Sequence, residues 1–434
     1  MSDYQLPAGY KQTEIGVIPE DWLLTSLEKI SAFITKGATP TTYGFSWVQD
    51  GVLFLRSECV SENGLDLSQS TFISRKAHNV LNRGEWRSGD ILITITGNVG
   101  RVVHISDDFG TGNMNQHIAR VRVISNEIYS KFVFHFLNQN SIRRSFNSIT
   151  TGQAYPQISL KQVREVIVPL PLLSEQRSLT QALSDVDALI AALDKLIAKN
   201  RDLKTATMQQ LLTGKKRLPG FGDGQGYKES VIGLIPEDWE VKQISEIADI
   251  DPENLIGNTH AKYEFNYISL EDVERGVLKG HSHQVFCTAP SRARRILRDG
   301  DILLSTVRPN LKSHLLFKKQ EHNWVCSTGF SVLRCKKGLS IPGLIFSHLF
   351  SGNIDGQIET LIAGSNYPAI NSSDVQKLKI EVSAVEEQRA IATVLSDMDN
   401  AISALESRLA KTQAIKQGMM QELLTGRIRL KIEK

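Results

Sequence analysis

The clearest alternation of apolar and polar residues lies in two stretches that are predicted to be long helices. Apolar residues recur there at alternating steps of four and three, as in the a and d positions of a heptad repeat. The seam consists of Leu179, Leu183, Val186, Ile190, Leu193 and Ile197 in the first stretch, and Ile391, Leu395, Met398, Ile402, Leu405 and Leu409 in the second. Gly214 and Gly426 follow the stretches as C-terminal caps would. From Glu175 to Thr213 such a helix would be about 58 Å long.

A heptad seam allows three arrangements of these helices. Each helix could pack on its own globular body, the seam could dimerise the protein, or the two helices could pair within one chain. Because both seams belong to one chain, we favour an intramolecular antiparallel coiled coil. Polar residues continue both seams, with Asn200 and Lys204 in the first and Thr412 and Lys416 in the second, which fixes register at some cost in packing.

The regions before the long helices have the pattern of mixed α/β bodies. Short apolar, β-branched runs at 90–96 and 301–307 follow tight glycine–aspartate turns and predict strands. The run at 117–124 alternates as a half-buried strand would, whereas 127–140 and 342–350 have the pattern of short helices. The fold class is therefore α+β, with two mixed α/β bodies joined by two long helices.

The whole chain is one unit repeated once. IGVIPEDW at 15–22 returns as IGLIPEDW at 232–239, LSDVD at 183–187 as LSDMD at 395–399, and QQLLTGKKRL at 209–218 as QELLTGRIRL at 421–430. GQAYP at 152–156 likewise matches GSNYP at 364–368. The order of these landmarks divides the chain into a first body (1–155), a first helical region (156–218), a second body (219–367) and a second helical region (368–434).

Composition narrows the class of protein. The chain has 434 residues, 41% of them hydrophobic and 22% charged, which is ordinary for globular proteins. No apolar run is long enough to span a membrane, and the N-terminus lacks the pattern of a secretory signal. The four cysteines form no CxxC pair, so we expect reduced thiols and a cytoplasmic protein.

Motifs that carry catalysis are missing from the sequence. It contains no GxGxxG opening a βαβ unit, no phosphate-binding loop, no NPPY-type methyltransferase motif and no GxSxG elbow. His281, His283 and Cys287 could be considered as zinc ligands, but the first copy has no counterpart and a fourth ligand is not evident. We therefore expect no metal site and no catalytic residue in this chain.

Basic residues are concentrated in the bodies. Residues 290–337 hold eleven lysines and arginines against three acids, a local excess of +8 in a chain of net charge +3. Clustered lysine and arginine neutralise phosphates, and arginine, asparagine and glutamine can read base edges, although a solvated basic face is the simpler alternative. The candidate DNA contacts are Lys36, Tyr43, Arg56, Arg75, Lys76, His78, Asn98, Arg101, Asn115, Gln116, Arg292, Arg294, Arg295, Arg308, Asn310 and Lys312.

The ordered duplicate motifs resemble those of the specificity subunit of type I restriction–modification enzymes, over essentially the whole chain. The paired IPEDW, GDIL, EQR and LLTG motifs carry this resemblance together with GQAYP and GSNYP. The resemblance implies that each body is a target recognition domain reading one half of a bipartite site in double-stranded DNA. It also implies that the helices form an antiparallel coiled coil, which spaces the bodies and docks two modification (methyltransferase) subunits.

The same resemblance assigns the chemistry to partners. S-adenosylmethionine is expected on the modification subunits, and ATP and Mg²⁺ on restriction subunits that translocate and cut DNA. In this chain the segments Thr96–Arg101 and Thr306–Lys312 are expected beside DNA, and Asp90 and Asp301 are expected to order turns. Asn115, Gln116 and His117 match a polar landmark for which the second copy has CSTGF instead. The competing hypotheses are a coiled-coil adaptor without sequence-specific DNA binding and a self-contained methyltransferase.

Overall fold

The computed structural model describes residues 6–62, 64–124, 127–152, 154–222, 226–318, 321–362 and 368–430. Most of the GSNYP landmark, as well as Gln153 and Lys319, falls outside these ranges. The chain separates into two compact units: unit 1 comprises Met1–Asp194 and Arg408–Lys434, and unit 2 comprises Lys195–Ser407. Each unit therefore contains one α+β body and segments of both long helices.

The described part of unit 1 has two larger β-sheets and three two-stranded ones, β1-β2, β15-β3 and β7-β8. An antiparallel sheet has the order β12-β11-β14-β4, and a second sheet, with the order β10-β13-β6-β9-β5, contains one parallel pair, β13 and β6. The strands are β1 Tyr10–Thr13, β2 Gly16–Pro19, β3 Leu23–Ser26, β4 Ser31–Lys36, β5 Trp47–Val48, β6 Val52–Leu55, β7 Val60–Ser61, β8 Gly64–Leu65, β9 Thr71–Ile73, β10 Trp86–Arg87, β11 Ile91–Thr94, β12 Val102–His104, β13 Thr111–Met114, β14 Ile118–Val123 and β15 Ile167–Leu170.

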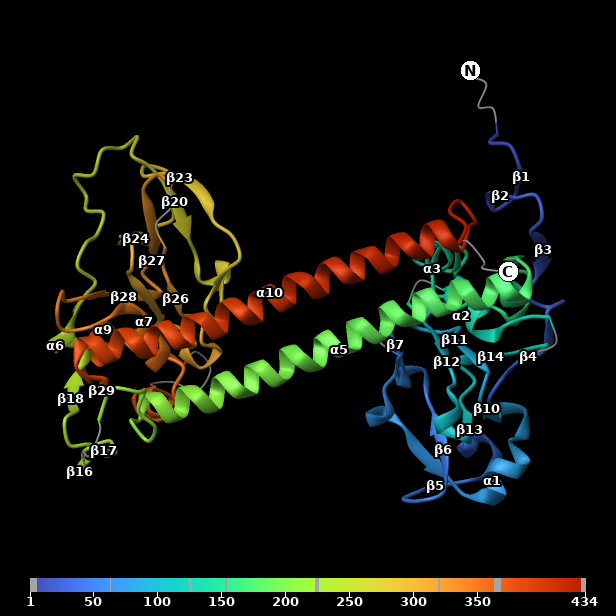
Figure 1. Ribbon diagram of the computed structural model, residues 1–434, viewed down its shortest axis with the longest axis horizontal. Helices are drawn as coiled ribbons and strands as arrows, with labels where there is room; N and C mark the ends of the chain where they lie inside the picture. Colours follow the sequence, from blue (N-terminus) through green and yellow to red (C-terminus); the bar gives the residue numbers. More distant parts are fainter. Residues whose placement is uncertain are drawn as a thin grey trace. The chain divides into compact units, whose positions relative to one another are not determined.

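Helices α2 Ser130–Leu137, α3 Asn140–Ser148 and α4 Leu160–Arg164 pack against the first of these sheets, whereas α1 Arg75–Val80 packs against the second. The main core of unit 1 joins β11 and β14 to α2, to the first turns of α5 (Leu173–Leu212) and to the last turns of α10 (Val385–Leu423). Figure 1 shows α3 next to that end of α10. The stretch predicted as one helix over 127–140 forms α2 only, because the chain turns at Asn138 and Gln139 before α3 begins.

Unit 2 repeats this plan. Its two larger sheets have the orders β19-β28-β25-β26 and β23-β20-β27-β24, the second with one parallel pair, β20 and β27. Three two-stranded sheets, β16-β17, β18-β29 and β21-β22, complete the described strands. Its strands are β16 Tyr227–Ser230, β17 Gly233–Pro236, β18 Glu240–Gln243, β19 Ala248–Ile250, β20 Glu264–Ile268, β21 Val273–Glu274, β22 Val277–Leu278, β23 Ser282–Val285, β24 Ala293–Ile296, β25 Ile302–Ser305, β26 Leu315–Leu316, β27 Trp324–Ser327, β28 Phe330–Cys335 and β29 Lys379–Val382. Its helices are α6 Ile244–Ile247, α7 Pro342–His348, α8 Gly352–Leu361 and α9 Ser372–Lys377, besides its parts of α5 and α10.

The strands predicted after the glycine–aspartate turns are present as β11 and β25, all of whose residues are buried. The stretch 117–124 forms a strand as predicted, β14, but the prediction that this strand is only half-buried is wrong. β14 lies between β11 and β4, and its first four residues are buried, including Arg120. Arg120 is accommodated because its guanidinium stacks 4.6 Å from the Phe33 ring centroid and donates to the Arg83 carbonyl.

The heptad seams are the covered faces of α5 and α10. Seven of the seam residues are buried (Leu179, Leu183, Leu193, Ile197, Ile391, Leu395 and Ile402). The other five, Val186, Ile190, Met398, Leu405 and Leu409, are half-buried. Off the seam, Leu189, Leu196 and Leu203 are 40%, 42% and 48% exposed. The spacing of four and three therefore identified the packed face correctly.

Contacts between α5 and α10 run in opposite directions along the two helices. In unit 2, Lys204 forms an ion pair of 2.5 Å with Asp399, while Arg201, one turn earlier in α5, pairs with Glu406 further along α10. In unit 1, Lys416 and Asp187 form the same pair as Lys204 and Asp399, also at 2.5 Å. Within unit 2, rising numbers in α5 thus meet falling numbers in α10.

Both long helices end at a glycine that no other residue could replace without strain. Gly214 and Gly426 have φ of 65° and 70°, in the left-handed region. A β-carbon on Gly214 would lie 2.4 Å from Pro236 Cγ, and one on Gly426 would lie 2.4 Å from Pro19 Cδ. The IPEDW segment therefore packs directly against the cap, which explains why the two motifs recur together in the sequence.

Candidate nucleic-acid interface

Three segments of unit 1 meet beyond the end of β11. The Ile95 amide donates to the His117 carbonyl, the Gly97 amide to the Pro156 carbonyl and the Ile158 amide to the Ile95 carbonyl, at 2.9, 2.9 and 3.0 Å. These bonds join residues 95–98, 115–117 and 154–158, which we call the junction of unit 1. The sequence had indicated these landmarks separately, and the fold brings them together.

Unit 2 has the same junction with different side chains. The Thr306 amide donates to the Gly329 carbonyl, the Arg308 amide to Pro368 and the Ile370 amide to Thr306, at 2.9, 2.8 and 3.0 Å. The junction of unit 2 is therefore 306–310, 327–329 and 368–370. Ser327–Gly329 occupies the place of Asn115–His117, so the polar landmark has a positional partner after all. Backbone bonds preserve this frame because they are insensitive to which side chains the frame carries.

The junction of unit 1 carries polar side chains that face away from the core. Asn98 is exposed, and the side chain of Gln116 hydrogen-bonds Thr39 and, at 3.2 Å, His117 Nε2. The His117 ring lies 6.3 Å from that of Tyr155, which is 63% exposed. Lys36 and Tyr43, on either side of Thr39, are exposed as well. Amides, a lysine and aromatic rings are groups that contact bases and phosphates.

In unit 2 the junction exposes an arginine on an unfavourable backbone. Arg308 has φ 48°, the left-handed region that Gly97 occupies in unit 1 with φ 76°. An arginine there costs about 1 kcal/mol relative to glycine, which is typical of residues retained for function. Asn310, two residues further on, is also exposed. Arg292 is exposed as well, and its backbone carbonyl accepts a hydrogen bond from the amide of Thr328 in the junction.

Much of the basic excess between 290 and 337 is neutralised within unit 2, contrary to a simple count along the chain. Arg295 pairs with Asp251 at 2.9 Å, Arg298 with Glu253 at 2.5 Å and Lys312 with Asp355 at 2.5 Å. Arg334 pairs with both Asp301 and Glu253, at 2.7 and 2.6 Å. The acids at 251 and 253 lie some 40 residues earlier in the sequence, beyond the counted window. Arg295 also has only 18% of its side chain exposed.

The other arginines and histidines of the candidate set have mixed surroundings. Arg294 stacks 5.1 Å from the Phe286 ring centroid and donates to its neighbour's carbonyl, whereas Arg56 donates twice to the Gln69 carbonyl. His78 hydrogen-bonds the Asn113 side chain, and Arg101 lies half-buried beside Val60.

The remaining candidates are clearer. Arg75 and Lys76 are exposed on α1, while Asn115 is buried and accepts the His117 amide at 3.1 Å. The surface candidates that remain are Lys36, Tyr43, Arg75, Lys76, Asn98, Gln116, Arg292, Arg308 and Asn310.

The aspartates of the glycine–aspartate turns order those turns, as expected, and also have a second role. Asp90 and Asp301 accept the amides of Arg87 and Arg298 at 2.8 and 2.7 Å. Each also binds an arginine through two hydrogen bonds, Arg122 at 2.6 Å and Arg334 at 2.8 and 2.7 Å. The hydrogen bond with the aspartate raises the pKa of each arginine. These arginines stand at matching places in β14 and β28, and the repeat could have revealed them.

The sequence placed an acid, Glu175 or Glu387, near the positive start of each long helix, but it did not predict that these carboxylates are buried or which residues they bind. Glu175 accepts from Trp22 Nε1 at 3.3 Å and from Arg429 at 2.9 and 2.6 Å. Glu387 accepts from Trp239 Nε1 at 3.0 Å and from Arg217 at 2.6 and 2.8 Å. Both carboxylates are 1% exposed. The IPEDW tryptophan, the EQR glutamate and the arginine after LLTG thus form one cluster, repeated in each unit.

Titratable side chains elsewhere in the bodies are suited to structure rather than chemistry. Burial lowers the pKa of His314 and His135 to about 3, and that of His104 to about 4, so these rings are neutral. Burial raises the pKa of the Cys335 thiol to about 11, which disfavours the nucleophilic thiolate. The considered zinc ligands His281 and His283 have separate partners, since the His281 ring lies 4.9 Å from that of Trp324 in a tilted arrangement and His283 faces Glu264. Within the described ranges no three His, Cys, Asp or Glu residues are grouped to hold a metal ion.

The geometry defines a duplicated α+β protein in which each copy carries the same backbone junction with different side chains. The family model for the type I restriction modification DNA specificity domain matches residues 19–199 and again 236–417. The chain therefore belongs to that family, and it is a specificity subunit with two such domains. This favours the DNA reader over the adaptor and the methyltransferase.

Named relatives agree with this assignment. The chain is 27% identical, over 97% of its own length and 97% of the relative's, to the putative type I restriction enzyme MjaX specificity subunit of Methanocaldococcus jannaschii. It is 27% identical to the MjaVIII specificity subunit of the same organism, over 67% and 69% of the two chains. A solved S subunit of the type I restriction–modification system from M. genitalium has the same fold, with a TM-score of 0.55 at 13% identity and coverage of 96% and 97%.

Proposed function

We propose that each junction reads one half of a bipartite target in double-stranded DNA. The observation that carries the proposal is the shared frame of backbone hydrogen bonds, which presents Asn98 and Gln116 in one unit and Arg308 and Asn310 in the other. A constant frame with different polar side chains is what two readers of different half-sites require. Arginine favours guanine and asparagine or glutamine favours adenine, so the two units should prefer different bases.

The second part of the proposal concerns α5 and α10. We infer that they form an antiparallel coiled coil that sets the distance between the two half-sites. The buried seam and the matched pairs Asp187–Lys416 and Lys204–Asp399 support this role, because polar pairs on a seam fix register. The same helices offer surfaces for two modification subunits, one for each repeat.

The remaining chemistry belongs, in this proposal, to partner subunits. The modification subunits would bind S-adenosylmethionine and methylate adenine, and restriction subunits would use ATP and Mg²⁺ to translocate and cut. The chain itself would hold no cofactor, and it would act in the cytoplasm, where its DNA is. In the described ranges no helix is both long and apolar enough to cross a membrane.

Exchange of one body tests the proposal. Residues 25–150 are replaced by the corresponding body of another family member, and the hybrid is expressed with its modification subunits. Methylome sequencing should show one half-site changed, with the other half-site and the spacer unchanged. Changes in both half-sites would mean that the bodies do not read independently. Unchanged methylation would mean that the first body does not read DNA.

A further inference from the structure

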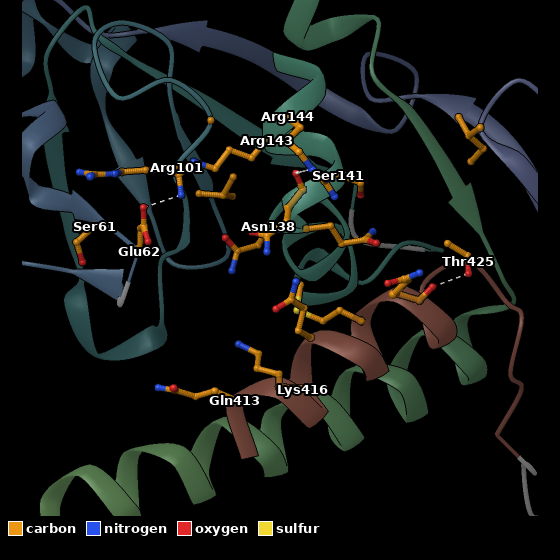
Figure 2. A pocket seen from close by; sticks show the side chains of 18 of the residues that line it. Ser61, Glu62, Arg101, Asn138, Ser141, Arg143, Arg144, Gln413, Lys416 and Thr425 are labelled. Carbon is orange, nitrogen blue, oxygen red and sulfur yellow. Dashed lines mark hydrogen bonds and ion pairs between the residues drawn. The ribbon is translucent and has the colours of Figure 1, made fainter. Parts of the chain in front are cut away.

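Unit 1 contains a cavity that the proposed reading of DNA does not use. It has a volume of about 480 Å³ and lies between the loop at Arg101, the start of α3 and the last turns of α10. Figure 2 shows Arg101, Arg143, Arg144 and Lys416 around it, together with Asn138 and Gln413. Its volume is within the usual range for a small-molecule site, and charged groups and amides make up most of its walls.

The charges around the cavity are mostly positive. Arg101, Arg143, Arg144, Lys416 and Arg427 line it against a single acid, Glu62. Arg143 binds Glu62 at 2.6 Å and Lys416 binds Asp187 at 2.5 Å. The Arg143 hydrogen bond and the nearby charge of Arg101 lower the pKa of Glu62. Among the described residues, Arg101 and Arg144 form no ion pair with an acid. The cavity therefore keeps an excess of positive charge.

The guanidinium of Arg101 has unused hydrogen-bonding capacity. Its Nη1 makes a long hydrogen bond of 3.5 Å to the Val60 carbonyl. Its Nε is buried and has no hydrogen-bond partner in the described part of the chain. A buried donor of this kind costs about 1–3 kcal/mol unless it is satisfied. An anion in the cavity would accept from it.

The start of α3 adds a second source of positive potential. Its N-cap residue, Gln139, makes no capping hydrogen bond, and its first turn holds no acidic residue. The first amides of a helix lack partners within the helix and carry partial positive charge. At the matching place in unit 2, α8 is capped by Ser351 and has Asp355 in its first turn. The first amides of α8 therefore have a side-chain cap and a nearby acid within the chain, whereas those of α3 have neither.

The two repeats differ at this cavity in the sign of one side chain. Asp355 of α8 stands where α3 has Arg143, and it pairs with Lys312 at 2.5 Å. Lys312 has the left-handed backbone that Gly100 has in unit 1. In unit 2 an internal ion pair, Lys312–Asp355, thus occupies the place where unit 1 has an open, positively charged cavity. A role in DNA half-site reading or in docking of paired subunits would be expected in both repeats.

We propose that this cavity binds one small phosphate-bearing molecule per chain. The phosphate would accept from Arg101, Arg143 and the first amides of α3, and the amides of Asn138 and Gln413 would contact the rest of the molecule. Because Lys416 and Gln417 of α10 form the opposite wall, the bound molecule would fasten the body of unit 1 to that end of α10. The proposal does not depend on the DNA-reading function.

Calorimetry on the full-length chain tests this proposal, with pyrophosphate, adenosine monophosphate and adenosine triphosphate as probes. We expect at least one of them to bind with a stoichiometry of one. Arg101→Gln should weaken its affinity about tenfold, the loss expected for one charge-assisted hydrogen bond. Arg143→Asp, which installs the residue of the second repeat, should abolish binding. Arg87→Gln is the matched control, because Arg87 belongs to the same unit but does not line the cavity.

The outcomes divide clearly. Binding that is lost in Arg101→Gln and Arg143→Asp, and kept in Arg87→Gln, supports the proposal. Failure of all three probes to bind, a stoichiometry of two, or binding indifferent to Arg101→Gln overturns it. A short duplex is titrated in parallel. If the variants weaken only duplex binding, the phosphate belongs to the DNA backbone and the small-molecule site is excluded. Circular dichroism melting verifies that each variant is folded.

Discussion

Three neighbouring arginines of unit 2 show that adjacent residues in a basic cluster have different functions. Arg292 is exposed near the junction, Arg294 stacks on Phe286, and Arg295 is paired with Asp251 and largely buried. β24 has a bulge between Ala293 and Arg295, which sets the direction of these side chains. The cluster therefore combines one surface cation, one stacked cation and one that stabilises the body.

Alanine substitutions should separate these roles. Arg292→Ala should leave the free energy of unfolding within about 0.5 kcal/mol of the parent and flatten the salt dependence of DNA affinity by about one unit. Arg295→Ala should destabilise the protein by about 2 kcal/mol, because Asp251 loses its buried partner. Urea unfolding and duplex titration at two salt concentrations measure both effects. Equal effects of the two variants on DNA affinity would contradict this division.

The buried histidines make stability depend on pH. His314 is 1% exposed and accepts the Ser305 amide on Nδ1 at 3.1 Å, which requires an unprotonated nitrogen. Burial lowers its pKa to about 3 in the folded state, whereas an unfolded histidine titrates near 6.5. The unfolded state therefore binds the extra proton between these values, and the stability contributed by neutral His314 is lost as pH falls below about 6.5.

His314→Asn tests this pH dependence, because the asparagine oxygen can accept the same amide without titrating. The slope of unfolding free energy against pH, between about pH 6 and 4, should become shallower by up to about 1.4 kcal/mol per pH unit. Urea unfolding at several pH values gives the slope. His283→Asn, at an exposed site, serves as the control and should leave the slope unchanged. If the His314→Asn variant keeps the parent's slope of unfolding free energy against pH, His314 does not cause this pH dependence.

At the scale of elements, the sequence predicted what local pattern determines. Heptad spacing identified the covered faces of α5 and α10, and the glycines identified their ends, because both depend on residues close in sequence. The burial of β14 was not predictable from its own residues, because Arg120 and Arg122 are polar. They become buried or paired only through Phe33 of β4 and Asp90 of the turn before β11.

The candidate site was predictable to a similar degree. The sequence indicated 96–101 and 115–117 as segments near DNA, and 152–156 only as a landmark of the repeat. That these segments meet, and that Arg295 and Lys312 are paired internally, depends on contacts between residues distant in sequence.

The length of the paired helices gives a prediction of its own. Removing seven residues from each, 190–196 from α5 and 402–408 from α10, keeps the heptad phase and both lysine–aspartate pairs. Each helix loses about 10 Å, so the spacer between half-sites should shorten by about three base pairs with both half-sites unchanged. Methylome sequencing measures this directly. Deleting 190–196 alone is the control and should abolish methylation. Methylation at the original spacing in the double deletion would contradict the proposal that α5 and α10 set the distance between the half-sites.

At the scale of the whole molecule, the last residues of the chain belong to unit 1. Tyr10 Oη donates to the Gly426 carbonyl at 2.9 Å, and Arg429 pairs with Glu175 and with Asp21. Ending the chain at Thr425 should therefore loosen residues 10–22 and 173–183, because Glu175 keeps its burial and loses its cation. Hydrogen exchange should rise in those segments and stay constant in 264–305 of unit 2. A chain ending at Leu430 retains Arg429 and should exchange like the parent.

The placement of Arg429 also orders events during synthesis. Unit 2 is one continuous run of chain, Lys195–Ser407, and is synthesised before the last segment of unit 1. Glu175 and Arg429 are 254 residues apart, so at about 5–20 residues per second the carboxylate waits about 13–50 seconds for its partner. During translation the nascent chain thus exposes an incomplete first domain for most of that interval. A product that terminates before Arg429 would leave Glu175 without its cation and the first domain open to proteases.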